Sequence, residues 1–129
     1  MCGNDGDDII YGGDGIVTSQ ELFGDFREQG TGTPSIGGDD KIYGGSDIAG
    51  TQTIAGGIGD DYILSGNNVA GDITIYGDND GPTLLNMEDE LGFNANDGDD
   101  IIVIDNDNQN VIAYGQGGND KIIGGWGLN

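Results

Sequence analysis

Pairs of acidic residues that directly follow a glycine are the feature of this sequence with the clearest chemical potential. The unit glycine, aspartate or asparagine, aspartate, any residue, isoleucine occurs as GDDIIY from Gly6, GDDKIY from Gly38, GDDYIL from Gly59, GDDIIV from Gly98 and GNDKII from Gly118. Adjacent carboxylates repel each other, and glycines held in one conformation cost conformational entropy. A cation would offset both costs, because such turns offer carboxylates beside backbone carbonyls and Ca²⁺ takes about six to eight oxygen ligands.

The candidate calcium ligands are the carboxylates and glycine carbonyls of these turns. A flexible glycine- and aspartate-rich linker is the alternative interpretation. Short blocks of Ile, Val, Leu, Tyr and Phe argue against it, because a solvated linker does not need them. The candidates are Asp8, Gly38, Asp40, Gly57, Gly59, Asp61, Gly98, Asp100, Gly118 and Asp120.

The stretch GGIGDDYIL at residues 56–64 resembles the RTX repeat, Gly-Gly-x-Gly-x-Asp-x-apolar-x, at every position. The resemblance covers most of the chain outside two insertions. It implies a parallel β-roll, in which calcium lies between stacked turns and is held by aspartate side chains and loop carbonyls. RTX proteins are secreted and fold on meeting extracellular calcium, so the resemblance also implies an extracellular or cell-surface location.

The charge balance favours cations as partners. The 129 residues include 24 acidic and 3 basic ones and no histidine, for a formal net charge of −21. This charge argues against nucleic acid as a partner, because phosphate binding needs clustered Lys and Arg. No apolar run approaches the length of a transmembrane helix, so we expect no membrane-spanning segment.

Catalysis is not expected of this chain. It has no histidine and a single cysteine, Cys2, so it offers no nucleophile paired with a base. The carboxylates that remain belong to the glycine turns. We therefore expect a protein that is not an enzyme.

A short apolar segment follows each turn. Other segments keep this strand character and lose the acids: TQTIAG from Thr51, GDITIYG from Gly71 and QNVIAYG from Gln109. Short strands separated by turns predict an all-β parallel solenoid with two strands and two loops in each coil. Together with the resemblance, this predicts a two-sheet right-handed β-solenoid, the parallel β-roll, with two inserted loop or short-helix segments. Eight strands are expected, with inward residues Ile10, Ile42, Ile54, Ile63, Ile75, Ile102, Ala113 and Ile122.

The chain is expected to be one module over residues 1–129, duplicated into halves of about 1–64 and 65–129, with insertions at about 14–36 and 79–96. In a coil of two strands, alternate loops fall on opposite edges. Counting eight strands places Asp40, Asp61, Asp100 and Asp120 along one edge as a calcium ladder. The same count places Asp8 on the opposite, metal-poor edge.

Both insertions resemble parts of EF-hands. The first, DGIVTSQELFGDF from Asp14, places Asp14 and Glu21 where an EF-hand loop ligates calcium, and a helix is expected from Leu22. The second, DNDGPTLLNMEDELGF from Asp78, offers Asp78 and Asp80 as ligands. An amphipathic helix that covers the flank of the roll is the alternative for these segments.

Together these patterns predict a calcium-binding, calcium-stabilised structural or adhesive module of a secreted protein. End-to-end self-association into a fibre is a further expectation. The alternative is a calcium-dependent folding or export module of a type I-secreted enzyme or toxin. A neighbouring catalytic domain in the full gene would favour the alternative, and many further copies of the module would favour the structural role.

Overall fold

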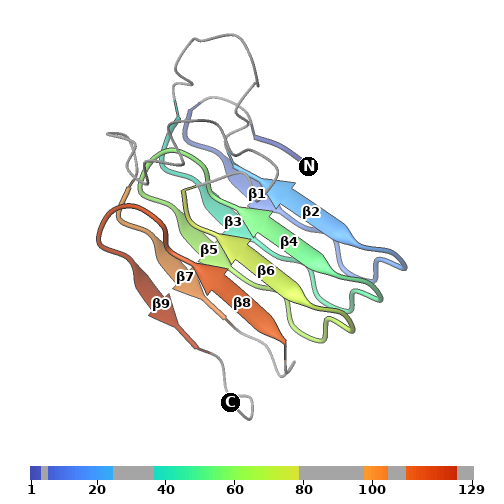
Figure 1. Ribbon diagram of the computed structural model, residues 1–129. Helices are drawn as coiled ribbons and strands as arrows, with labels where there is room; N and C mark the ends of the chain where they lie inside the picture. The colour runs from blue at the N-terminus through green and yellow to red at the C-terminus, as the bar shows by residue number, and fades with distance from the viewer. Residues whose placement is uncertain (4–5, 25–36, 79–97, 105–109, 125–129) are drawn as a thin grey trace, which may run out of the picture.

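The structure is a computed structural model that describes residues 1–3, 6–24, 37–78, 98–104 and 110–124. The regular elements in these ranges are all short β-strands, and no helix occurs among them (Figure 1). The strands are β1 (Ile9–Tyr11), β2 (Gln20–Phe23), β3 (Lys41–Tyr43), β4 (Gln52–Ala55), β5 (Tyr62–Leu64), β6 (Ile73–Tyr76), β7 (Ile101–Val103), β8 (Val111–Tyr114) and β9 (Lys121–Ile123).

The strands form two parallel sheets. One sheet has the order β1-β3-β5-β7-β9 and the other has the order β2-β4-β6-β8. Successive strands therefore lie in different sheets, and each return to a sheet adds the next parallel strand (Figure 1). Parallel neighbours need a crossover between them, and here each crossover is a strand of the other sheet. The prediction of an all-β fold with parallel strands is confirmed.

The core lies between the sheets and is built from the inward residues of the strands, together with Ile48 and Val69 of the connections. Parallel pairing in register stacks isoleucine on isoleucine along the larger sheet, from Ile10 through Ile42, Ile63 and Ile102. These four residues are buried, as are Leu22, Ile54 and Ile75 of the facing sheet. The last strand differs, because Ile122 of β9 is 46% exposed although it continues the same row.

Strand β2 corrects the sequence prediction, which expected eight strands and a helix beginning at Leu22. Residues Gln20–Phe23 pair in parallel with β4. Gln20 and Leu22 are buried and Glu21 is exposed, which is the alternation of a strand with one face in the core. The predicted helix is wrong here because the segment pairs with β4, and its polar inward residue, Gln20, finds hydrogen-bond partners in Gln52 and in the glycine turns.

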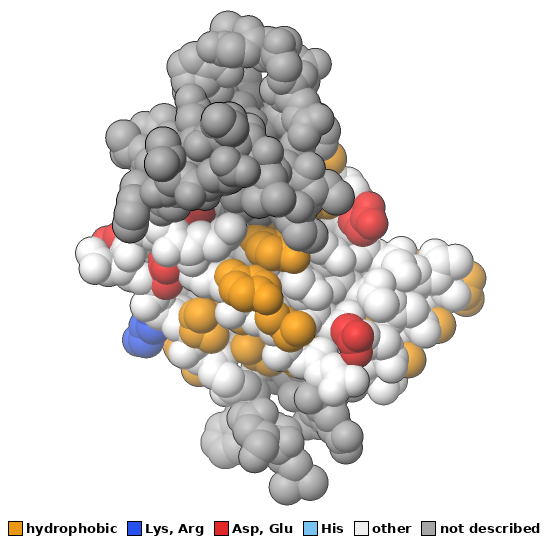
Figure 2. All heavy atoms as spheres, viewed as in Figure 1, with side chains coloured by type: hydrophobic (Ala, Val, Ile, Leu, Met, Phe, Trp, Pro, Cys, Tyr) orange, Lys and Arg blue, Asp and Glu red, His pale blue; other side chains and the backbone are white. Residues whose placement is uncertain are grey.

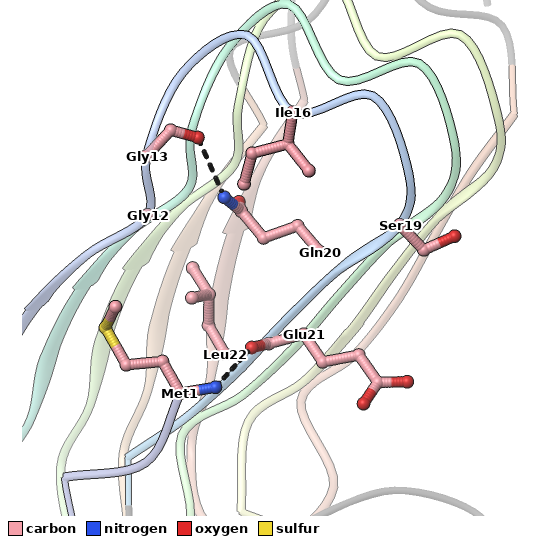
Figure 3. A pocket seen from close by; sticks show the side chains of 8 residues that line it. All are labelled: Met1, Gly12, Gly13, Ile16, Ser19, Gln20, Glu21 and Leu22. Carbon is pink, nitrogen blue, oxygen red and sulfur yellow. Dashed lines mark hydrogen bonds between the residues drawn. The ribbon is translucent and has the colours of Figure 1, made fainter.

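Two stacked glutamines, Gln20 and Gln52, bury their polar side chains at the edge where the β1–β2 and β3–β4 connections turn. Gln20 donates from Nε2 to the carbonyl of Gly13 (3.0 Å), as Figure 3 shows, and its Oε1 accepts the N–H of Gly45 (2.9 Å). Gln52 donates to Oε1 of Gln20 (2.8 Å) and accepts the N–H of Gly66 (2.9 Å). Burial of these polar side chains is therefore compensated by hydrogen bonds that tie one coil to the next.

The outward faces of the sheets carry aromatic pairs and apolar side chains. Figure 2 shows hydrophobic side chains gathered over the face of the four-stranded sheet that is turned toward the viewer. The rings of Tyr76 and Tyr114 stack there, with centroids 5.4 Å apart. On the other sheet Tyr11 stacks on Tyr43, with centroids 5.0 Å apart. In-register cross-strand pairs of this kind stabilise neighbouring coils. The described part of the chain contains no apolar helix of membrane-spanning length.

Candidate metal-binding edge

The β4–β5 and β8–β9 connections, which the structure describes throughout, turn at the edge of the molecule where the strands of the five-stranded sheet begin (Figure 1). An aspartate stands directly before each strand of the five-stranded sheet, and we call this row the aspartate edge. Asp8 belongs to it, so its expected place on the opposite edge is wrong. The unexpected strand β2 adds one crossover after β1 and so shifts the count of edges. The row consists of Asp8, Asp40, Asp61, Asp100 and Asp120.

Backbone hydrogen bonds hold the aspartate edge in register. In each case the N–H of one aspartate donates to Oδ1 of the aspartate in the following coil. Their side chains therefore point along the stack in one direction and are fixed by the backbone of the preceding coil. The four bonds run from Asp8 to Asp40 (2.8 Å), Asp40 to Asp61 (2.9 Å), Asp61 to Asp100 (2.9 Å) and Asp100 to Asp120 (3.1 Å).

A second row, formed by the residue before each of these aspartates, runs beside the first in the opposite sense. The N–H of Asp39 donates to Oδ1 of Asp7 (3.0 Å), which belongs to the preceding coil. The bonds from Asp60 to Asp39, Asp99 to Asp60 and Asn119 to Asp99 repeat this pattern. The two adjacent carboxylates of each turn thus bond in opposite directions, the outer one exposed and the inner one largely buried.

The inner row leaves carboxylate oxygens that need a partner. Oδ2 of Asp8 and Oδ2 of Asp100 are buried and accept no hydrogen bond. A buried anionic oxygen without a donor carries a large desolvation cost. Asp100 is only 1% exposed, so water does not remove that cost. A bound cation would remove this desolvation cost, so these residues are suited to hold a metal ion.

Glycine carbonyls stand beside these carboxylate oxygens. A Cβ atom at Gly77 would overlap both Oδ2 of Asp100 and the carbonyl oxygen of Gly115 in the next coil. Gly56 stands in the same relation to Oδ2 of Asp61 and to the carbonyl oxygen of Gly77. Each such glycine therefore lets one carboxylate oxygen and one carbonyl oxygen approach the same point of the backbone. That is an all-oxygen donor set, which hard cations prefer.

The other glycines that the sequence singled out line the same turns. A Cβ atom at Gly59 would overlap the carbonyl oxygen of Gly38, one at Gly98 that of Gly59, and one at Gly118 that of Gly98. These carbonyls are therefore stacked from coil to coil. Gly57 has a φ of 123° and donates its N–H to the carbonyl of Gly77 (2.9 Å). Its part in the turn is thus a backbone bond between coils.

Three carboxylates converge where the chain leaves β6. One ligand oxygen from each of Asp78, Asp100 and Asp120 lies within 4.8 Å of the others. Burial raises the pKa of Asp100 to about 8, and the negative charges of Asp78, Asp120 and Asp60 add to this rise, while a hydrogen bond with the backbone of Asp61 opposes it. A cation at this point would reverse the effect, because it favours the charged carboxylate.

The EF-hand resemblance suggested four ligands in the insertions, and the structure describes three of them. Asp14 lies in the β1–β2 connection, and its Oδ1 accepts the N–H of Ser46 (2.8 Å). Glu21 lies in β2 and its side chain points out of the sheet, as Figure 3 shows. The loop is followed by a strand, so the helix of an EF-hand is absent at residues 20–23. Asp78 joins the aspartate edge, and Asp80 lies outside the described residues.

Comparison with known proteins adds no relative to this picture. No protein-family model, no curated protein and no solved structure matches the chain. The interpretation of the aspartate edge therefore depends on its own residues and their geometry.

Proposed function

We propose that this chain is a calcium-binding, calcium-stabilised module of the RTX type, folded as a parallel β-roll, with a structural or adhesive role in a secreted protein. The observation that carries the proposal is the aspartate edge, where buried carboxylate oxygens stand beside glycine carbonyls in successive coils. The clearest instance is Asp100, which is only 1% exposed and whose Oδ2 accepts no hydrogen bond.

Calcium fits this edge better than other common metals. The donors at the aspartate edge are carboxylate and backbone carbonyl oxygens, which suit hard cations. The chain has no histidine, and its one cysteine, Cys2, is exposed and is not part of the aspartate row. Mg²⁺ demands small, near-ideal octahedral sites and keeps several waters, whereas Ca²⁺ accepts irregular cages of carbonyls and carboxylates. The ions would lie between adjacent turns, held by the inner aspartates and the carbonyls of Gly77, Gly115 and their equivalents.

The repeated geometry favours a structural role. Each coil contacts the coils on either side of it, as in other solenoids, so stability is the sum of many similar interfaces. Cations placed at those interfaces would link coil to coil and make the whole stack depend on calcium. An extracellular location fits sites of this kind, because extracellular calcium modules have Kd values of about 10⁻⁴ to 10⁻³ M.

A pair of matched variants tests the role of the aspartate edge. Asp61→Asn keeps an oxygen that can accept the N–H of Asp40 and removes one buried charge at the edge. Asp72→Asn removes an exposed charge just before β6, on the opposite edge. We expect Asp61→Asn to raise the calcium midpoint of folding about tenfold, a change of about 1.4 kcal/mol, and Asp72→Asn to leave it almost unchanged. Circular dichroism during a calcium titration measures both midpoints, and equal midpoints would refute the proposed edge.

End-to-end self-association is part of the same proposal. Strands β8 and β9 are the outermost strands of their sheets among the described residues, and Ile122 and Ile123 of β9 are 46% and 41% exposed. Unpaired parallel edges with apolar side chains favour further strand pairing. We expect calcium to promote reversible assembly, because it neutralises the acidic edge that otherwise keeps chains apart. Light scattering in calcium should show growing particles that a chelator disperses, and a monodisperse monomer at high micromolar concentration would rule this out.

A further inference from the structure

Asp78 adds a carboxylate that the glycine and aspartate repeat does not supply. It directly follows Gly77, at the place that Gly57 and Gln116 occupy in two other described turns. Those two residues have positive φ values, 123° and 77°, and neither offers a charge. Asp25 follows Gly24 in the same way but lies outside the described residues. Among the turns that the structure describes, Asp78 is thus an extra acidic group.

The carboxylate of Asp78 is held by two backbone donors from two coils. Its Oδ1 accepts the N–H of Gly98 (2.7 Å), and its Oδ2 accepts the N–H of Gly117 (2.7 Å). The residue is 7% exposed. Because both oxygens are fixed, little side-chain entropy remains to be lost when an ion binds, and the carboxylate is already oriented toward its neighbours.

These neighbours are Asp100 and Asp120, and one ligand oxygen of each of the three residues lies within 4.8 Å of the others. Asp100 provides independent evidence that an ion binds here. It is 99% covered, and its Oδ2 accepts no hydrogen bond and lies against Gly77, the residue before Asp78. The carbonyl oxygen of Gly115 lies against the same glycine. Three carboxylates and a carbonyl oxygen thus lie close together, and one of the carboxylate oxygens, Oδ2 of Asp100, is buried without a hydrogen-bond donor.

We propose that Asp78, Asp100 and Asp120 form a single high-affinity site that binds calcium before the rest of the aspartate edge does, and that takes trivalent lanthanides in its place. The inference rests on the proposed function, since it assumes that the aspartate edge binds calcium. Affinity in calcium sites rises with the number of charged ligands and with the rigidity of the site. Asp78 increases both relative to the turns that have only the repeat aspartates. A third carboxylate also favours a trivalent over a divalent ion, because the attraction grows with the charge of the ion.

Terbium titration with matched variants tests this inference. Tyr76 lies two residues before Asp78, so tyrosine-sensitised terbium luminescence reports the site. In the wild type we expect one tight binding step followed by weaker ones. Asp78→Asn should weaken the tight step by about tenfold or more, the effect of removing about 1.4 kcal/mol of binding free energy. Asp40→Asn, two coils before Asp100 in the same row, should leave the tight step unchanged and reduce the weaker ones.

Each outcome of the titration decides a different point. A tight step that survives in Asp78→Asn overturns the inference and leaves the proposed function intact. A wild type that binds neither terbium nor calcium overturns both.

If Asp78→Asn does not fold, the wild type answers the question by itself. Substoichiometric Ce³⁺, added to the calcium-saturated protein, broadens only nearby amide signals in the NMR spectrum. The amides of Gly98 and Gly117, which bond to Asp78, should broaden first. First broadening at Asp8 or Asp40 would contradict a preferred site at Asp78.

Discussion

Removing calcium is expected to unfold most of this protein. The chain carries a formal net charge of −21, and the inner row of the aspartate edge places several of those charges in buried positions. Without cations, these carboxylates must be neutralised or exposed to water, and self-repulsion adds to the cost. Each of the proposed calcium sites would contribute about 2.7 kcal/mol when free calcium exceeds its Kd a hundredfold. A few such sites equal the total stability of a typical domain, about 5–15 kcal/mol.

Circular dichroism in chelator and in millimolar calcium measures this effect. We expect the strand signal to be lost in chelator and regained cooperatively on addition of calcium. A sodium chloride control of equal ionic strength separates specific binding from charge screening, since screening alone would not place a cation against the buried carboxylates. A strand signal that is the same in chelator and in calcium, or that sodium chloride alone restores, would show that the edge does not hold the fold together.

Gly77→Ala is expected to damage both the packing of the aspartate edge and its proposed metal site. The added methyl group would overlap Oδ2 of Asp100 and the carbonyl oxygen of Gly115. The carbonyl belongs to the backbone of the next coil, so it cannot move aside as the end of a flexible side chain could. Overpacking of this kind costs about 3 kcal/mol. The methyl group would also occupy the space beside the carboxylate oxygen that we assign to calcium, so the dependence of stability on calcium should fall too.

Gly13→Ala is the matched control. No heavy atom lies within 4 Å of the Cβ that this change would add, and Gly13 is not among the described glycines with positive φ. Its carbonyl keeps the hydrogen bond from Gln20. We expect the free energy of unfolding to change by less than about 1 kcal/mol. Urea unfolding of both variants in saturating calcium gives the comparison, and similar losses for the two would contradict the close packing at Gly77.

The inward isoleucines and the shared edge of four aspartates could be predicted from the sequence because both recur at fixed positions of the repeat. Each GDD or GND turn places an aspartate one residue before a strand and an isoleucine in its centre, as at Asp61 and Ile63. Parallel stacking then superimposes equivalent residues. The structure shows this superposition in the pairing of Ile42 with Ile63 and of Ile63 with Ile102.

Strand β2 could not be predicted in the same way because only one of its two inward residues, Leu22, is apolar. Gln20 is buried only because Gln52 and the backbone of neighbouring coils satisfy its amide, and hydropathy gives no sign of such partners. The preceding Asp14 and Gly15 instead resemble a calcium loop. A signal was present, since the spacing from Gln20 to Leu22 matches that from Gln52 to Ile54. Missing this strand also moved Asp8 to the wrong edge.

The place of Asp78 could not be deduced from spacing either. It stands 20 residues before Gly98, its partner in the same coil, and the repeat is interrupted between them. In the sequence it therefore groups with Asp80 rather than with Asp100 and Asp120. Only the stacking of coils brings the three carboxylates within 4.8 Å.

Cations bound along the aspartate edge would be located by anomalous diffraction from crystals grown with calcium, or with terbium in its place. We expect anomalous density between successive turns, beside the inner carboxylates of Asp40, Asp61 and Asp100 and close to Asp78. Density confined to the opposite edge, near Gln20 and Gln52, or no density at the aspartate edge in saturating calcium, would contradict this expectation.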